Sequence, residues 1–362
     1  MTSKELHPEP DRNRSFMNST PVTAQTILQP IILGPNQPAD RFYAGGHRIA
    51  DLRGLSDTRT HVPEDWVAST TSLFGDAGTG LSRLPNGELL RDTITSDPVG
   101  WLGHEHVERF GSDPTLLVKL LDAGQRLPVH VHPDDGFARR HLACPYGKTE
   151  GWVIVEAEPG ATVHLGFTRD VTQEQVRRWV DQQDTAAMLA AMHAVPVHPG
   201  DGVLVPAGMV HAIGSGILLI ELQQPSDLSV LMEWKGFEID GRIDGHLGIG
   251  FDTALACVDR RATTPERLTA LRTAATAVAS ERPFPAEADR FFRADRLRVR
   301  ARTRLEAGFA VLVVLDGGGI LRTEGGHETE LSRGMTIVVP YGAGSLEVTG
   351  GQDMIRCRPP QS

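Results

Sequence analysis

A thirteen-residue pattern occurs twice in this chain of 362 residues. Residues 199–211 read PGDGVLVPAGMVH, and residues 333–345 read RGMTIVVPYGAGS. Each copy has a glycine six residues before a proline, a mostly apolar run between them, and another glycine two residues after the proline. Such runs, bounded by Gly and Pro, are typical of buried β-strands. Because internal repeats reveal repeated structural units, the pattern predicts two related β units, of which only the first ends in a histidine, His211.

Two stretches between the expected strands predict helices. In residues 172–193, TQEQVRRWVDQQDTAAMLAAMH, Thr172 followed by Gln175 is a capping-box pattern. In residues 263–280, TTPERLTALRTAATAVAS, Thr264 can cap a helix and Pro265 suits its first position.

The fold class that follows is mainly β, with short helical insertions. We expect residues 26–255 to form the first unit, which begins with a β region and contains a helical insert near 172–193. Residues 256–285 are then a helical connector, and residues 286–362 a degenerate C-terminal β unit. Residues 1–25 are charged and have no apolar core, which predicts a disordered lead-in.

The composition excludes several classes of partner and location. The net charge is −10 and no run of Lys and Arg occurs, which argues against nucleic acid. No run approaches the roughly 18 apolar residues of a membrane span. Cys144, Cys257 and Cys357 are widely spaced and odd in number, which favours reduced thiols. We therefore expect a cytoplasmic protein that binds a small molecule, and the oligomeric state is left open.

Two histidines share one face of a predicted strand. The stretch DAGQRLPVHVHPDD, residues 122–135, places His130 and His132 two residues apart, so both side chains would point the same way. A His-x-His pair is not specific by itself, because the chain has a second one, His104-Glu105-His106. We interpret that second pair as a solvated, charged segment, since no strand pattern surrounds it.

The surroundings of the first pair resemble the two signature motifs of the cupin superfamily. Gly124 stands six residues before His130, Glu150 follows His132, and a Pro-x-Gly-x-x-His segment ends at His211. The resemblance implies an antiparallel jelly-roll barrel that holds one divalent metal ion through these four side chains. A barrel brings remote strands together, which explains how ligands so far apart in the sequence could meet.

Longer segments resemble one family of cupins, the type I mannose-6-phosphate isomerases, especially short bacterial ones. These segments are LLVKLLDAGQRLPVHVHPDD, YGKTEGWVIVEAEPGATVHLGF and VPVHPGDGVLVPAGMVHAIGSGILLIELQQPSDLSV, together with EDWVAS at 64–69. The likeness covers about residues 40–362. It implies an aldose–ketose isomerase of carbohydrate metabolism that contains zinc and moves a proton between C1 and C2 of a sugar through an enediol.

The family's metal ligands match this sequence closely. His132, Glu150 and His211 match ligands, whereas His130 stands where the family has a glutamine ligand. Three His and one Glu suit Zn best, and also Mn, Fe or Ni.

The family's sugar-site residues match at four further positions. Lys148 matches a lysine of the sugar site and Glu221 an acidic residue proposed there, so both are candidate catalytic residues. Asp227 and Trp66, in the segment EDWVAS, are candidate substrate-binding residues. The alternatives are a surface lysine at 148, a structural ion pair at Glu221, and core packing for Trp66.

Two departures from the family bear on the substrate. Pro128 stands where the family usually has a phosphate-binding serine, and Leu231 where it has an arginine. Losing a guanidinium weakens the recognition of a phosphate dianion. We therefore expect an isomerase of mannose 6-phosphate or a related sugar, with two alternatives: an isomerase or epimerase of an unphosphorylated sugar, and a non-catalytic sugar-binding or regulatory cupin.

Overall fold

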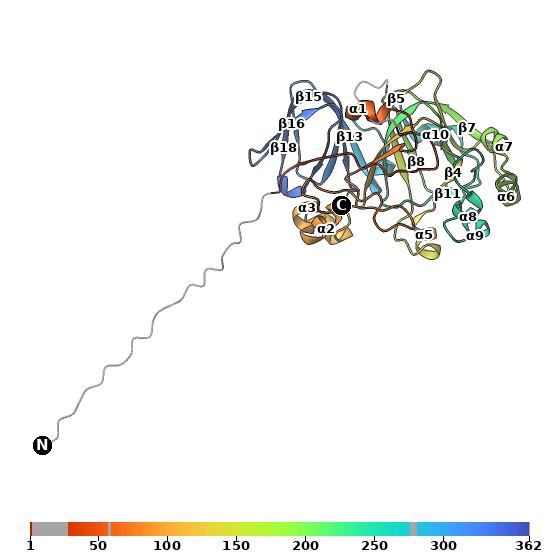
Figure 1. Cartoon of the computed structure of the whole chain (residues 1–362), viewed down its shortest axis with the longest axis horizontal. Coiled ribbons are helices and arrows are strands. Elements are labelled where there is room, and N and C mark those ends of the chain that lie inside the picture. Colours follow the sequence, from red (N-terminus) through yellow and green to blue (C-terminus); the bar gives the residue numbers. More distant parts are fainter. Residues whose placement is uncertain (2–27, 57–58, 276–280, 362) are drawn as a thin grey trace.

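The structure, a computed structural model, describes Met1 and residues 28–56, 59–275 and 281–361. Its strands form three sheets in which all neighbouring strands are antiparallel (Figure 1). The prediction of a mainly β protein is therefore confirmed. The predicted disordered lead-in falls almost entirely on residues 2–27, which lie outside the described residues.

Two sheets pack face to face and form the half of the molecule that contains His130. The first sheet has the order β12 (Arg272–Thr273), β8 (Gly202–Val205), β5 (Glu150–Ala157), β10 (Ile217–Gln223), β3 (Leu117–Ala123) and β2 (Glu64–Val67). The second has the order β11 (Val230–Leu231), β4 (His130–Val131), β9 (His211–Ile213), β6 (Thr162–Phe167) and β7 (Met192–Pro196). Trp152 and Leu219 from the first sheet share one buried cluster with Leu165 and Ile213 from the second.

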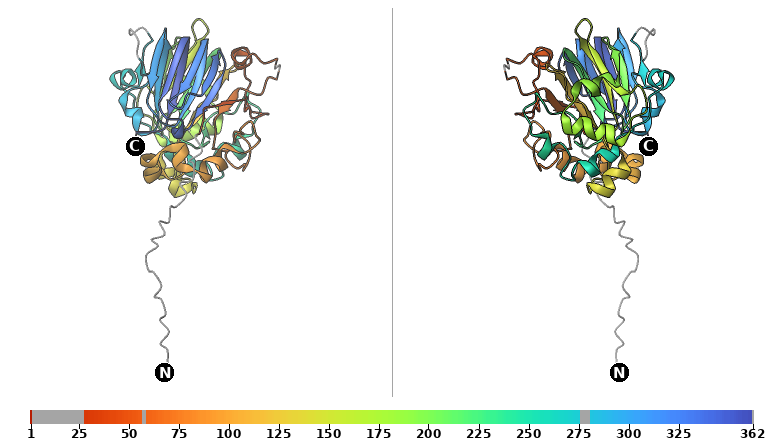
Figure 2. Two further views of the ribbon diagram at one scale, coloured as in Figure 1. Left: turned by 90° about the vertical axis from the view of Figure 1, so that its left-hand side faces the viewer. Right: turned by 90° about the vertical axis from the view of Figure 1, so that its right-hand side faces the viewer.

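The third sheet lies beside them and contains most of the C-terminal strands, coloured blue in Figure 2. Its main path is β1 (Ile31–Leu33), β17 (Thr336–Val339), β15 (Ala310–Thr323), β18 (Leu346–Arg358) and β13 (Arg293–Val299), with β14 (Arg302–Leu305) on β18 and β16 (Glu328–Ser332) on β15. The strand β1 comes from the other end of the chain, so the third sheet is not built from C-terminal residues alone. The division of the chain into domains stays a prediction.

The two copies of the sequence repeat have similar local structure. Each forms a four-residue strand, β8 in the first copy and β17 in the second. Each strand follows a glycine with a positive φ, 94° at Gly200 and 83° at Gly334. Residues with side chains rarely adopt this conformation, which explains why glycine occurs at the same place in both copies.

Both predicted helical stretches contain helices, and each is shorter than expected. In the first, the capping box of Thr172 and Gln175 is present and begins α6 (Gln173–Gln182). A left-handed residue, Gln183, ends it, and α7 (Thr185–Ala190) follows. In the second, Thr264 caps α10 (Pro265–Ala270), which ends where β12 pairs with β8. The rest of that stretch includes residues 276–280, outside the described residues.

Further short helices cover the ends of the sheets, and α2 and α3 lie together at one end (Figures 1 and 2). They are α1 (Arg48–Arg53), α2 (Leu90–Ser96), α3 (Pro98–Leu102), α4 (His104–Phe110), α5 (Asp135–His141), α8 (Gly241–Asp244) and α9 (Phe251–Ala254), with 3-10 turns η1 (Leu255–Cys257), η2 (Ala286–Arg290) and η3 (Tyr341–Ala343). No helix in the described part of the chain is both long enough and apolar enough to cross a bilayer.

The prediction for His104-Glu105-His106 was wrong in part. These residues begin α4, where His104 and Glu105 are exposed as expected. His106 is buried, however, and its ring Nε2 lies 2.7 Å from the carbonyl oxygen of Asp113. A helix turns successive residues by about 100°, so neighbours in the sequence can face solvent and core.

Candidate functional site

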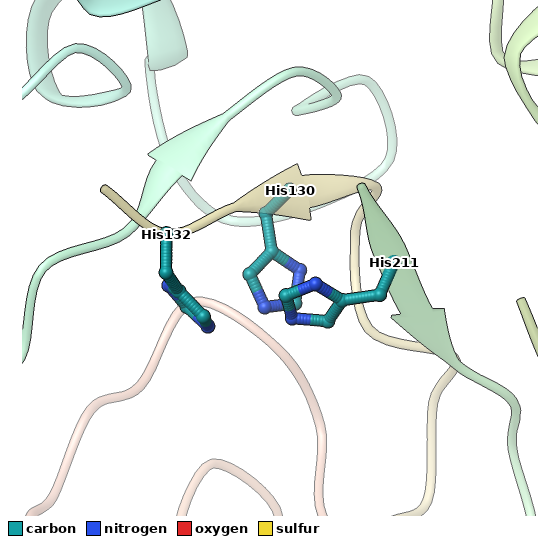
Figure 3. A group of neighbouring side chains, drawn as sticks. All are labelled: His130, His132 and His211. Atoms are coloured by element: carbon teal, nitrogen blue, oxygen red, sulfur yellow. The ribbon is translucent and has the colours of Figure 1, made fainter. Parts of the chain in front are cut away.

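Three histidines converge on one side of two paired strands (Figure 3). β4 supplies His130, and His132 follows directly after it, while β9 supplies His211. His130 lies directly opposite His211 in the antiparallel pair β4–β9. The ring centroids are 4.1 to 5.0 Å apart. One ring nitrogen from each lies within 4.8 Å of the others, close enough to share a metal ion.

The other ring nitrogen of each histidine contacts a backbone carbonyl. Nδ1 of His130, His132 and His211 lies 2.8, 2.7 and 2.8 Å from the carbonyl oxygens of Pro128, Leu228 and Met209. A carbonyl only accepts hydrogen bonds, so each Nδ1 must donate its proton. This leaves each Nε2 without a proton and able to bind a metal. Carbonyl contacts of this kind orient metal-binding histidines in proteins.

Glu150 reaches the same point from β5. Its carboxylate oxygens lie 3.0 Å from Nε2 of His132 and 3.2 Å from Nε2 of His211. Nε2 of His211 is buried without a hydrogen-bond partner among the described residues, whereas Oε2 of Glu150 faces the ammonium of Lys148. Buried polar atoms normally have partners, so the unpartnered nitrogen of His211 fits a bound cation. The structure thus brings together all four of the predicted ligands.

Electrostatics at this point keep His130 and His132 neutral and the Glu150 carboxylate charged. Burial lowers the pKa of His132 to about 3 and that of His130 well below its ordinary value. Burial by itself raises the pKa of Glu150, but Lys148 and His132 outweigh it and hold that pKa well below its usual range. Neutral imidazole and ionised carboxylate are the metal-binding forms.

The two candidate catalytic residues lie beside the predicted ligands. Nζ of Lys148 is 2.7 Å from Oε2 of Glu150 and 3.0 Å from Nε2 of His132. Lys148 is buried, so the alternative of a surface lysine was wrong. Trp152 donates from Nε1 to Glu150 at 3.0 Å and to Glu221 at 3.3 Å. Burial, together with repulsion from Glu150, raises the pKa of Glu221 to about 8.

A cavity of about 230 Å³ opens onto this group. Its lining contains both charged and apolar residues. The charged residues are Arg41, Glu64, Lys119, Lys148, Glu150, Glu221, Asp227 and Asp244. Pro128, His130 and Leu231 belong to the rest of the lining, so the two departures from the family pattern, Pro128 and Leu231, line the same cavity as the predicted metal ligands His130 and Glu150.

The structure separates the two candidate substrate-binding residues. Asp227 lines the cavity, and its Oδ1 lies 3.5 Å from Nζ of Lys119. Trp66 is fully buried and is not part of the lining. Its Nε1 donates to Glu64 at 2.6 Å, and its ring lies 4.2 Å from Nζ of Lys119. Trp66 therefore holds two residues of the lining, Glu64 and Lys119, in place from the core side.

Sequence reasoning missed four of the eight charged residues of the cavity: Arg41, Glu64, Lys119 and Asp244. Lys119 is a single lysine between apolar residues of β3, Leu117-Val118 before it and Leu120-Leu121 after it, which is a usable sign of a functional position. Its side chain is only 3% exposed and lies 3.6 Å from Glu64 and 3.9 Å from Glu221. Arg41 lies in a loop without periodicity, so its sequence context gives no comparable sign.

No protein-family model matches the chain. Two curated proteins are similar to it over about half of their length: a probable mannose-6-phosphate isomerase of Bacillus subtilis and a mannose-6-phosphate isomerase of Streptococcus mutans. The first is 35% identical over 185 residues, which are 51% of this chain and 55% of that protein. The second is 32% identical over 204 residues, which are 55% of this chain and 58% of that protein.

Solved structures of two related enzymes match nearly the whole chain. The mannose-6-phosphate isomerase of Bacillus subtilis has a TM-score of 0.70 at 21% identity, covering 91% of this chain and all of that one. A mutant of phosphomannose isomerase from Salmonella typhimurium has a TM-score of 0.68 at 16% identity, with 92% of this chain covered. These enzymes have the cupin fold, which confirms the predicted fold class. By sequence over half its length and by fold over nearly all of it, the chain is similar to mannose-6-phosphate isomerases.

Proposed function

We propose that this protein is a metal-dependent aldose–ketose isomerase that converts mannose 6-phosphate to fructose 6-phosphate or acts on a related sugar. The observation that carries the proposal is the meeting of His130, His132, His211 and Glu150 at a cavity that also contains Lys148. The names of the similar proteins support the choice of reaction. All three cysteines are free thiols, in keeping with a cytoplasmic enzyme.

The proposed ligands are the three histidines, through Nε2, and Glu150. Nitrogen and carboxylate ligands in this number favour Zn, and Mn, Fe or Ni also fit. When bound, the metal would polarise the oxygens on C1 and C2 of the sugar and so acidify the hydrogen on C2. Lys148 would also orient the Glu150 carboxylate, because its ammonium nitrogen lies 2.7 Å from Oε2 of Glu150.

Isomerisation also needs groups that carry protons. In the aldose, a base removes the hydrogen from C2, the electron pair forms the C1–C2 double bond, and O1 gains a proton. The proton then returns to C1 while O2 loses its own, which gives the ketose. Glu221 and Lys148 are the candidates for these transfers, because both line the cavity beside the predicted ligands. Asp227, which also lines the cavity, would accept hydrogen bonds from sugar hydroxyls.

Arg41 is our candidate for the phosphate. The reacting end of the sugar must lie at the metal, so the phosphate points toward the mouth of the cavity. Among the three cavity cations, Arg41 has the most exposed side chain, 15%, against 6% for Lys148 and 3% for Lys119. Its ion pair with Glu64 is loose, at 3.6 Å, and its Nε has no hydrogen-bond partner in the described part of the chain. A guanidinium with free donors suits a phosphate dianion.

The proposal is tested by proton exchange on the purified, metal-loaded enzyme. Mannose 6-phosphate and fructose 6-phosphate are incubated in deuterated water, and incorporation at C1 and C2 is followed by NMR. We expect exchange that stops after chelation and returns with Zn or Mn. Exchange only with unphosphorylated sugars would support the first alternative, an isomerase or epimerase of an unphosphorylated sugar. If no aldose or ketose of a wider panel shows exchange, the remaining interpretation is a non-catalytic sugar-binding or regulatory cupin.

A further inference from the structure

A second cavity lies between the C-terminal sheet and the helices α3 and α4. It has a volume of about 540 Å³ and shares no lining residue with the cavity of the proposed metal centre. Three arginines line it: Arg293, Arg356 and Arg358, which we call the arginine cluster. Residues 359–361 and the first turn of α4 contribute to the same lining. The proposed isomerase reaction makes no use of this cavity.

The arginine cluster is an arrangement that strand pairing by itself disfavours. Arg293 on β13 lies directly opposite Arg358 on β18 in the antiparallel register. Arg356 lies two residues earlier on β18, so its side chain is on the same face as that of Arg358. Like charges directly opposite one another destabilise a sheet. Three guanidinium groups therefore gather where charge repulsion opposes them.

Carboxylates compensate only one member of the cluster. Arg358 forms ion pairs with Asp295 at 2.8 Å and with Glu306 at 3.0 Å. Arg293 and Arg356 form no ion pair within the described ranges of the chain, and instead donate to the carbonyl oxygens of Pro359 at 3.0 Å and Glu306 at 2.8 Å. The lining therefore has three guanidinium groups against the carboxylates of Glu105 and Glu306, and Asp295 pairs with Arg358.

Arg356 is the most buried arginine of the cluster and has few hydrogen-bond partners. It is only 4% exposed, and its Nε is buried with no hydrogen-bond partner among the described residues, as is the Nε of Arg358. Burial and the neighbouring Arg358 lower the pKa of Arg356 to about 10. Buried donors without partners are rare in native proteins, and a bound water or ion is one explanation of such a donor.

We propose that the arginine cluster binds a phosphate dianion, either free or as the phosphoryl group of a small metabolite. Guanidinium groups bind phosphate oxygens through paired hydrogen bonds, and the cavity has room for more than the phosphate itself. The site joins the end of β18 to α4, because Arg109 of α4 also donates to the carbonyl oxygen of Gln361 at 2.8 Å. Binding therefore stabilises the contact between the C-terminal sheet and these helices.

The test is calorimetric titration of the full-length protein with inorganic phosphate and with glycerol 3-phosphate, at constant ionic strength in chloride. The variants are Arg293→Gln and Arg356→Gln. The matched control is Arg304→Gln, which removes one positive charge from the same sheet at an exposed position whose partner is the hydroxyl of Ser345. We expect each cluster variant to weaken phosphate binding by about tenfold or more, and the control to bind like the wild type. Equal affinity for both probes would show that the phosphoryl group alone determines binding. Tighter binding of glycerol 3-phosphate would show that the site also recognises the organic part of a ligand.

Thermal unfolding distinguishes a binding site from a purely structural network. In phosphate-free buffer, Arg293→Gln should unfold at the same temperature as the wild type or higher, because one of two opposed charges is gone. A lower unfolding temperature for Arg293→Gln, with no effect of phosphate on the wild type, would overturn the proposal. So would phosphate binding that survives both cluster variants and disappears in Arg41→Gln, since it would belong to the other cavity.

Discussion

Leu231 lies directly opposite His130 where β11 pairs with β4, and both side chains line the cavity. An apolar residue thus stands beside a proposed metal ligand, at the position where the resemblance to mannose-6-phosphate isomerases predicts an arginine. The cavity nevertheless contains a guanidinium, that of Arg41, which belongs to the loop between β1 and α1. The charge that recognises phosphate has, on our proposal, moved to a different segment of the chain.

Replacing Arg41 should selectively weaken the use of phosphorylated sugars. We expect Arg41→Gln to lower kcat/KM for mannose 6-phosphate by about 10- to 100-fold, because a charge-assisted hydrogen bond is lost. Arg41→Lys should retain part of the activity. The control is Arg48→Gln, because Arg48 is equally exposed but pairs with Asp122 outside the cavity. Steady-state kinetics with mannose 6-phosphate and mannose give the comparison, and an equal loss for both sugars would contradict the assignment.

A compensating substitution also tests the assignment of Arg41 to the phosphate. Leu231→Arg, introduced into Arg41→Gln, should restore part of the lost kcat/KM for the phosphorylated sugar, because it returns a guanidinium to the same cavity. If the double variant is no better than Arg41→Gln, the cavity does not have room for phosphate beside Leu231.

Metal binding should depend on the predicted ligands. We expect about one divalent metal ion per wild-type chain by elemental analysis, and none after His132→Ala combined with His211→Ala, since two ligands are lost. His198→Ala is a suitable control, because His198 is an exposed histidine near Asp201. A full metal content in the double variant would place the metal elsewhere.

Proton transfer should fail while metal binding persists in Glu221→Gln. The substitution keeps the shape of the side chain and removes its ability to exchange a proton, so exchange at C1 and C2 should fall by about 10²- to 10⁴-fold. The control Glu156→Gln changes a carboxylate on β5 that is about half exposed. Unchanged exchange in Glu221→Gln would leave Lys148 as the remaining candidate.

Trp66→Phe tests the corrected role of Trp66. The phenylalanine keeps most of the buried ring but cannot donate to Glu64, which leaves a buried carboxylate oxygen with one hydrogen bond fewer. The free energy of unfolding should fall by about 1–3 kcal/mol, measured by urea denaturation. A raised KM with unchanged stability would instead indicate direct contact with the sugar.

Glu64 should make the protein sensitive to acid. Burial raises its pKa, but Arg41 and Lys119 outweigh burial and hold that pKa well below its usual range. A carboxyl group with a lowered folded-state pKa stabilises the protein above its unfolded pKa of about 4.3, and this stabilisation is lost as the pH falls. The difference in unfolding free energy between wild type and Glu64→Gln should therefore be largest near pH 7 and shrink below about pH 4. A difference that is constant with pH would show that the charge of Glu64 is not involved.

The sequence alone was sufficient for the mainly β fold and for the four residues that meet at the proposed metal centre. Alternation along a strand places His130 and His132 on one face, whereas Glu150 and His211 were predicted from the resemblance to the cupin motifs. The capping box at Thr172 is predictable from the local sequence, since it involves residues only three apart.

Only the tertiary structure decided what surrounds these residues. Trp66 was expected at the sugar and lies in the core, whereas Arg41, with no distinguishing pattern, lines the cavity. The opposition of Arg293 and Arg358 depends on the register of two strands more than fifty residues apart. Long-range pairing sets such neighbours through the packing of whole sheets, and no short stretch of sequence contains that information.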